Sequence, residues 1–177
     1  MNDEQTRARF ESLTLPLMKD AYNLARWLMR NEPDAEDVVQ DSYLKAFRFF
    51  EKFRTEGNAR AWFLRIVRNT CYDALSARNL KEKELVPEGE INDIEDTTPG
   101  PCASVVAKAT IETVRKAIEA LPVDFREVVV LRELEGLSYK EISDVAGIPL
   151  GTVMSRLSRA RDQLQLLLRE RKENDEL

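Results

Sequence analysis

The segment from Glu135 to Arg169 constrains the fold of this chain more than any other stretch, because it carries the start and stop signals of two closely linked helices. Ser138 and Glu141 have the spacing of a capping box, in which each side chain bonds the other residue's backbone N–H. Gly147 is placed to end the first helix, and Pro149 is tolerated in the first turn of the next. The segment therefore predicts a helical hairpin with a short turn.

The second helix of this hairpin has two distinct faces. One is apolar and repeats at helical spacing; it comprises Leu150, Val153, Leu157, Ala160, Leu164 and Leu168. The other is polar and basic, and it comprises Thr152, Ser155, Arg156, Arg159 and Gln163. Such side chains bond phosphates and base edges in the major groove, so the hairpin is interpreted as a DNA-binding helix-turn-helix. An amphipathic hairpin with merely solvated arginines is the alternative.

An acidic segment separates the chain into two parts of nearly balanced charge. The net charge of −5 is unfavourable for a protein that binds DNA unaided, since non-specific affinity comes from neutralising phosphates. Residues 81–107 hold two lysines and seven acidic residues, with few large apolar side chains. We expect this segment to be a flexible linker, because it cannot bury enough apolar surface to fold. The 177 residues then form two small domains, 1–80 and 108–177.

The scarce residue types exclude several classes of function. Histidine is absent and the only cysteines are Cys71 and Cys102, which excludes a Cys/His zinc site and histidine-based catalysis. No phosphate-cradling glycine loop or clustered acid/base pair is evident, so we expect no catalytic residues, no metal and no cofactor. The first ten residues are charged and every apolar run is too short to span a bilayer. We therefore expect a cytoplasmic protein with no membrane insertion.

Two helices are predicted near the start of the chain. The first covers Leu13–Met29, and the second begins at Asp34, which we expect to be its N-cap. The second helix carries a stripe of side chains at i, i+3, i+4 and i+7, namely Asp37, Gln40, Asp41 and Leu44. A leucine amid charges indicates a surface that binds a partner protein. A solvated face with one stray leucine is the alternative.

A third helix is predicted over residues 59–78, after a loop around Gly57, and Asn58 is placed to cap it. One of its faces interleaves basic, aromatic and amide side chains, namely Trp62, Arg65, Arg68, Asn69, Tyr72 and Ser76. Such a face suits a single strand of nucleic acid, whose phosphates bond arginine and whose bases stack on aromatic rings. A packed Trp62 beside a cationic, solvated face is the alternative.

Two more helices are predicted between the acidic segment and the hairpin. One runs from about Val105 to Leu121. The next ends at Gly136, and Asp124 with Glu127 is expected to form its capping box. Every predicted element is helical, so the expected fold class is all-α.

Three stretches together resemble a bacterial RNA polymerase sigma factor of the extracytoplasmic-function (ECF) group: DAEDVVQDSYLKAF, AWFLRIVRNTCYDAL and LPVDFREVVVLRELEGLSYKEISDVAGIPLGTVMSRLSRARDQL. The resemblance covers nearly the whole chain. It implies a sigma region 2-like helical domain over 1–80, a flexible acidic linker over 81–107 and a region 4-like helix-turn-helix domain over 108–177. It also implies a function, which is to direct the polymerase core enzyme to specific promoters and to promote DNA strand opening.

The resemblance gives a role to each of three surfaces. The core-binding surface, implied to contact the β′ clamp helices, consists of Asp37, Gln40, Asp41 and Leu44. The minus-ten surface, implied to hold the non-template strand, consists of Asn58, Arg60, Trp62, Arg65, Arg68 and Asn69. The minus-thirty-five surface consists of Thr152, Ser155, Arg156, Arg159 and Arg161. Promoter DNA, the β flap of the polymerase and an anti-sigma factor are the other implied partners.

Two other classes of protein share some of these features. A stand-alone regulator would bind duplex DNA through the hairpin alone, but it gives no reason for the face from Trp62 to Tyr72. A sigma-like decoy that titrates an anti-sigma factor could lose the base-reading arginines, yet Arg156 and Arg159 are present. A flexible linker permits both splayed and packed domains in the free protein, and a packed form would mask the DNA-facing surfaces.

Overall fold

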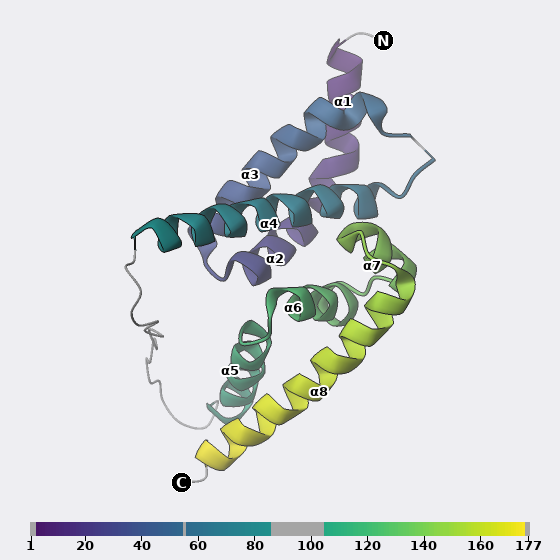
Figure 1. Cartoon of the computed structure of the whole chain (residues 1–177). Helices are drawn as coiled ribbons and strands as arrows, with labels where there is room; N and C mark the ends of the chain where they lie inside the picture. The colour runs from purple at the N-terminus through teal and green to yellow at the C-terminus, as the bar shows by residue number, and fades with distance from the viewer. Residues whose placement is uncertain (1–2, 55, 86–104, 176–177) are drawn as a thin grey trace.

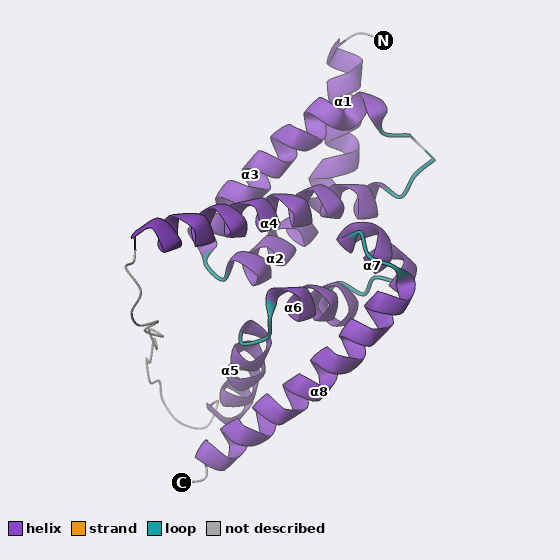
Figure 2. Cartoon of the chain, in the orientation of Figure 1, coloured by secondary structure: helices purple, strands orange, loops and turns teal. Residues whose placement is uncertain are grey.

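The computed structural model describes residues 3–54, 56–85 and 105–175, and all regular elements within them are helical (Figures 1 and 2). The expected all-α class is confirmed. The helices are α1 (Asp3–Thr14), α2 (Met18–Met29), α3 (Glu32–Phe49), α4 (Ala59–Leu85), α5 (Val105–Glu119), α6 (Val123–Val129), α7 (Tyr139–Ala146) and α8 (Leu150–Asp175). We call α1–α4 the N-terminal half and α5–α8 the C-terminal half.

The start of the chain departs from the predicted helix boundaries. The helix expected over Leu13–Met29 corresponds to α2, which begins only at Met18, because a 3₁₀ turn over Leu15–Leu17 that contains Pro16 precedes it. Leu13 and Thr14 instead end α1, a helix that was not predicted. The expected N-cap at Asp34 was wrong. Asn31 caps α3 instead, since its side chain accepts a hydrogen bond of 2.8 Å from the Asp34 backbone N–H. Pro33 therefore lies in the first helical turn, where its missing N–H costs no intrahelical bond.

Helices α2, α3 and α4 pack against one another and form the centre of the N-terminal half (Figure 1). Their apolar stripes meet in a core in which Ala21, Leu24, Leu28, Leu64 and Val67 are almost fully buried. Cys71 is also buried there, and burial raises the pKa of its thiol to about 12. The thiol is thus neutral at physiological pH and packs as a small core side chain.

The C-terminal half contains the predicted hairpin. In the capping box of α7, Ser138 Oγ accepts the Glu141 N–H at 3.2 Å and the Glu141 carboxylate accepts the Ser138 N–H at 2.7 Å. Gly136 and Gly147 have φ angles of +68° and +67°, a left-handed conformation that glycine adopts without strain. The predicted glycine ends of both helices are therefore confirmed.

The predicted capping box of α6 was wrong. Helix α6 begins after Pro122 with no side-chain cap, and Glu127 lies buried in the helix instead of bonding back to its start. The helix continues into a π-helical turn over Val130–Leu134 that leads to Gly136.

The two halves are packed together in this structure. Helix α6 packs on α2 and helix α7 packs on α4 (Figure 1), and one continuous cluster of buried apolar residues joins Val67 and Cys71 to Val128 and Leu131. The ends of the expected linker are helical, because α4 continues to Leu85 and α5 begins at Val105. The rest of the expected linker, residues 86–104, lies outside the described residues.

Replacing Ser138 with alanine should lower the free energy of unfolding by about 1 kcal/mol, because the Glu141 N–H loses its acceptor. Urea unfolding followed by circular dichroism measures this change. Ser158→Ala is the matched control, since Ser158 is exposed in the middle of α8. Equal losses in the two variants would contradict the capping role.

Candidate functional site

The core-binding surface lies on the exposed side of α3. Asp37, Gln40 and Asp41 are exposed, and Leu44 exposes 53% of its surface although it lies among charges. Lys45 pairs with Asp41 at 3.1 Å on the same helix. The structure thus brings all four predicted residues of this surface onto one open helix face.

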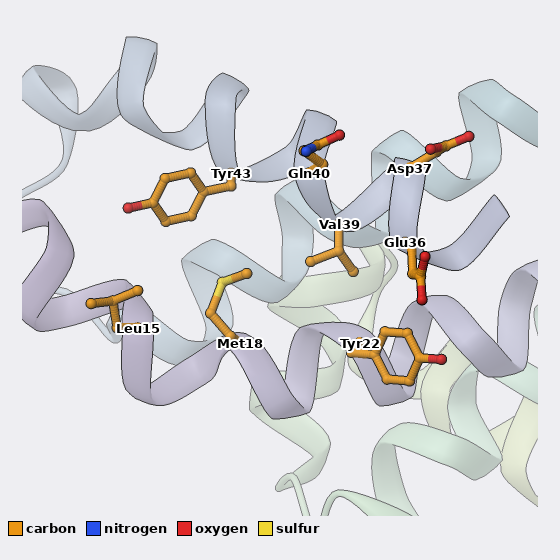
Figure 3. A pocket seen from close by; sticks show the side chains of 8 residues that line it. All are labelled: Leu15, Met18, Tyr22, Glu36, Asp37, Val39, Gln40 and Tyr43. Carbon is orange, nitrogen blue, oxygen red and sulfur yellow. The ribbon is translucent and has the colours of Figure 1, made fainter. Parts of the chain in front are cut away.

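An open groove of about 460 Å³ lies beside this surface, between α3 and the segment from the 3₁₀ turn into α2 (Figure 3). Figure 3 shows Leu15, Met18 and Tyr22 along one side of the groove and Gln40 with Asp37 along the other. Apolar residues from a break between helices were not identified from the sequence, because the pattern there predicts one continuous helix. The groove suits an apolar side chain of a partner helix whose basic residues reach the acidic rim.

The minus-ten surface of α4, in contrast, faces the C-terminal half. Arg68 donates two hydrogen bonds to the carboxylate of Glu127 in α6, at 2.5 and 3.3 Å. Glu127 is fully buried and Arg68 retains 17% of its side-chain exposure. Tyr72 donates a third hydrogen bond to the same carboxylate, at 2.7 Å. A buried carboxylate is tolerated because its charge and its lone pairs are satisfied in this way.

Burial and charge shift the pKa values of this cluster. For Arg68, burial disfavours the charged form, but the hydrogen bond and the charge of Glu127 outweigh it and raise the pKa. Burial, reinforced by Glu127, also raises the pKa of the Tyr72 hydroxyl. Arg68 thus stays cationic and Tyr72 stays a neutral donor, and the guanidinium lies 3.7 Å above the centre of the Tyr72 ring.

Two other residues of the minus-ten surface also bond the C-terminal half. Arg60 donates to the backbone carbonyl of Glu135 at 2.9 Å, and its guanidinium lies 3.6 Å from the Glu135 carboxylate. Asn58 accepts the Ala61 N–H at 3.0 Å, which confirms it as the cap of α4, and its amide donates to Glu141 at 2.9 Å. Three predicted strand-binding side chains therefore carry protein partners.

The remaining residues of the minus-ten surface differ in their exposure. Trp62 is half-buried, and its ring packs on Phe53 at a centroid distance of 4.6 Å, as in the packed alternative. Arg65 and Asn69 are exposed, although Arg65 approaches the turn at Gly147 in the C-terminal half. The surface is thus partly covered by protein, and it is neither fully solvated nor free to hold a nucleic-acid strand.

The minus-thirty-five surface lies on α8, around the helix from its buried residues Val153, Leu157 and Ala160. Ser155 and Arg159 are exposed, while Thr152 and Arg156 are half-buried, and within the described part of the chain neither of these arginines forms an ion pair. Arg161 is different, because it pairs with Glu133 at 2.6 Å. The helix-turn-helix therefore presents four of the five predicted residues without an acidic partner.

Arg126 is a buried residue that no pattern in the sequence singles out. Its guanidinium donates to the carbonyl of Trp27 across the two halves at 3.1 Å and to the carbonyl of Leu121 at 3.2 Å. Burial, together with the charge of Arg30, lowers its pKa to about 10, and its Nε has no hydrogen-bond partner. Arg126 remains charged at physiological pH and ties α6 to the end of α2.

Neither a metal site nor a membrane span emerges from the residues that the structure describes. No three acidic, cysteine or histidine side chains among them converge as they would around a metal ion. None of the described helices combines the length and the hydropathy of a membrane-spanning segment.

Comparison with known proteins identifies two matching family models. The Sigma-70 region 2 model matches residues 15–80, and the Sigma-70 region 4 model matches residues 111–164. The chain is 34% identical over 152 residues to an ECF RNA polymerase sigma-E factor of Haemophilus influenzae, covering 80% of this chain and 77% of that protein.

Two solved structures are similar to this chain over nearly its whole length. One is the sigma factor RpoE in complex with the anti-sigma factor NepR from Bartonella quintana, with a TM-score of 0.72, 29% identity, and coverage of 91% of this chain and 97% of the other. The other is CnrH in complex with the cytosolic domain of CnrY, with a TM-score of 0.66, 25% identity, and coverage of 93% and 90%.

Replacing Arg68 with methionine should lower the free energy of unfolding by about 3 kcal/mol, because the buried Glu127 carboxylate loses its cation. Adding Glu127→Leu should recover most of the loss, since no buried charge remains. Urea unfolding measures both changes. Arg161→Met is the control, because its ion pair with Glu133 is half-exposed and should contribute less than about 1 kcal/mol.

Proposed function

The chain belongs to the sigma-70 family of RNA polymerase sigma factors, and from this membership we propose how its residues divide promoter recognition. It directs the polymerase core enzyme to specific promoters and promotes DNA strand opening for transcription initiation. One observation supports the residue assignments. The core-binding and minus-ten surfaces lie within residues 15–80, matched by the region 2 model, and the minus-thirty-five surface lies within residues 111–164, matched by the region 4 model. This role requires no bond-making step by the chain's own side chains.

The core-binding surface is proposed to dock on the β′ clamp helices. Asp37, Gln40 and Asp41 would bond basic and amide groups of those helices, and Leu44 would bury its exposed side chain against them. The groove lined by Leu15, Met18 and Tyr22 supports this assignment, because it offers apolar contact area directly beside the acidic side chains. Burial of such area contributes roughly 25 cal/mol per Å².

The minus-ten surface is proposed to capture the non-template strand once the duplex opens. Arg60, Arg65 and Arg68 would pair with phosphates, while Asn58 and Asn69 would bond exposed base edges. Trp62 would stack on a base from its position at the start of α4, where its ring already packs on Phe53. Holding unpaired bases stabilises the open form of the promoter at the expense of the duplex.

The minus-thirty-five surface is proposed to read duplex DNA in the major groove. Arg156 and Arg159 suit guanine edges or phosphates, and Thr152 and Ser155 suit phosphates or bases at the start of the recognition helix. Arg161 would contact the DNA backbone after leaving Glu133. The C-terminal domain, 108–177, would thereby fix the position of the N-terminal domain, 1–80, with residues 81–107 joining them.

Other partners follow from the family and its relatives. The β flap of the polymerase is proposed to hold the C-terminal domain. One similar structure is a complex with a protein named as an anti-sigma factor, and we propose an anti-sigma factor for this chain as well. The proposed site of action is the cytoplasm, where the polymerase works.

Replacing Asp37, Gln40 and Asp41 together with alanine should abolish co-elution with core RNA polymerase in gel filtration, because the polar contacts of the core-binding surface are lost. The control replaces Glu112, Gln165 and Glu170, which are exposed and lie outside this surface. They also comprise two carboxylates and one glutamine, and each glutamate is one methylene group longer than the aspartate it matches. Their triple alanine variant should co-elute normally. Undiminished co-elution of the first variant would refute the assigned surface.

Replacing Arg156 with alanine should weaken binding of the holoenzyme to promoter duplexes about tenfold and relax the base preference at one position, because a good arginine–base contact contributes roughly 1–3 kcal/mol of discrimination. Selection from a randomised promoter library measures both effects. Arg169→Ala, near the far end of the same helix, is the control and should change neither. An unchanged base preference in the first variant would exclude Arg156 as a reader.

A further inference from the structure

An open cavity lies where the end of α2, the last turns of α4 and the start of α6 meet. Its volume is about 550 Å³, which is within the range of small-molecule sites. One side is apolar, and we call it the apolar wall; it comprises Leu28, Met29, Leu75 and Val123. The polar residues of the cavity are three arginines, two asparagines and one glutamate, and none of them belongs to the three surfaces described above.

Hydrogen-bond donors exceed acceptors among these polar residues. Arg78 pairs with Glu82, the one carboxylate of the cavity, at 3.2 Å. Arg30 and Asn79 are exposed, and their side chains have no hydrogen-bond or ion-pair partner within the described part of the chain. Three positive charges, those of Arg30, Arg78 and Arg126, thus stand against one negative charge. Guanidinium and amide donors of this kind bind phosphate oxygens.

Arg126 contributes a charge that is buried in the wall between the halves. It exposes only 5% of its surface, its two terminal nitrogens bond neutral backbone carbonyls, and its Nε has no hydrogen-bond partner. Burial, followed by the charge of Arg30, lowers its pKa to about 10. Arg126 and Arg30 therefore repel each other, and an anion beside them would relieve that repulsion.

The backbone at Arg30 adds a second, independent observation. Arg30 ends α2 with a φ angle of +67°, and within the described residues it is the one non-glycine residue with a positive φ. Side chains are disfavoured in this left-handed conformation. The chain thus places a guanidinium at the mouth of the cavity despite a local cost, as is frequent at ligand sites.

We propose that this cavity binds a small organic phosphate. Arg30 and Arg78 bond the phosphate oxygens, Asn79 donates a further hydrogen bond, and Arg126 adds its buried positive charge. The apolar wall covers the organic part of the ligand. Because Arg126 and Val123 come from α6 and the other groups from the N-terminal half, the site is complete only where the two halves meet.

The test uses isothermal titration calorimetry of the full-length protein at constant ionic strength, with adenosine monophosphate and inorganic phosphate as the two probes. Both should bind saturably at one site. Adenosine monophosphate should bind roughly tenfold more tightly, because its adenosine group buries part of the apolar wall. Equal affinities would overturn the assignment to an organic phosphate.

Replacing Arg30 with glutamine should weaken binding of adenosine monophosphate about tenfold, because a charge-assisted hydrogen bond is lost. Arg30 is exposed and belongs to neither DNA-binding surface, so the loss would not reflect unfolding or binding to those surfaces. Arg169→Gln is the matched control, since it removes the same charge from the exposed side of α8. Equal affinities of these two variants would overturn the site.

Replacing Glu82 with glutamine should have the opposite effect. It removes the one carboxylate of the cavity and releases Arg78, so adenosine monophosphate should bind several-fold more tightly. Glu170→Gln removes an exposed negative charge from α8 and should leave the affinity unchanged. Circular dichroism verifies the helix content of every variant. The absence of saturable binding to the unmodified protein, or equal affinities of Glu82→Gln and Glu170→Gln, would overturn the proposal.

Discussion

The relative placement of the two halves depends on one buried carboxylate. Glu127 has no exposed surface, and an ionised group in such a position requires a cation and hydrogen-bond donors. The donors come from Arg68 and Tyr72 in the other half. The donor–acceptor distance of a hydrogen bond varies by only a few tenths of an ångström. The bonds to Glu127 therefore fix the position of α6 relative to α4 more tightly than apolar contact does.

Capping-box spacing predicted the start of the hairpin correctly. The same spacing at α6 predicted a capping box that does not form, because Glu127 pairs with a residue distant in sequence. The capping box at Ser138 and the left-handed Gly147 need only neighbouring residues, so the sequence is sufficient to predict them. Asp124 and Glu127 have the same spacing, but the carboxylate of Glu127 bonds Arg68, which lies 59 positions earlier in the chain. No local pattern contains that partner. Glu127 therefore forms the buried pair with Arg68 and not the capping box with Asp124.

The surfaces themselves were predictable to the level of a helix face. Amphipathic spacing grouped side chains of α3 and of α4, and the structure exposes the α3 group, whereas Asn58, Arg60 and Arg68 of the α4 group bond the C-terminal half. Which element covers a helix face could not be predicted in this way, because it depends on the packing of elements that are distant in sequence. The groove beside α3 was missed for the same reason, since it requires the helix break at Leu15–Leu17.

Arg60 donates one hydrogen bond to an acceptor in its own half and one to an acceptor in the other half. Its Nε bonds Asp20 of the N-terminal half at 2.8 Å, and only the bond to the Glu135 carbonyl reaches across. An arginine side chain loses about 2 kcal/mol of rotamer entropy when it is fully immobilised. Because Asp20 and Arg60 belong to the same half, this restraint does not depend on the C-terminal half, and in the proposed minus-ten role it would present a preorganised guanidinium to the strand.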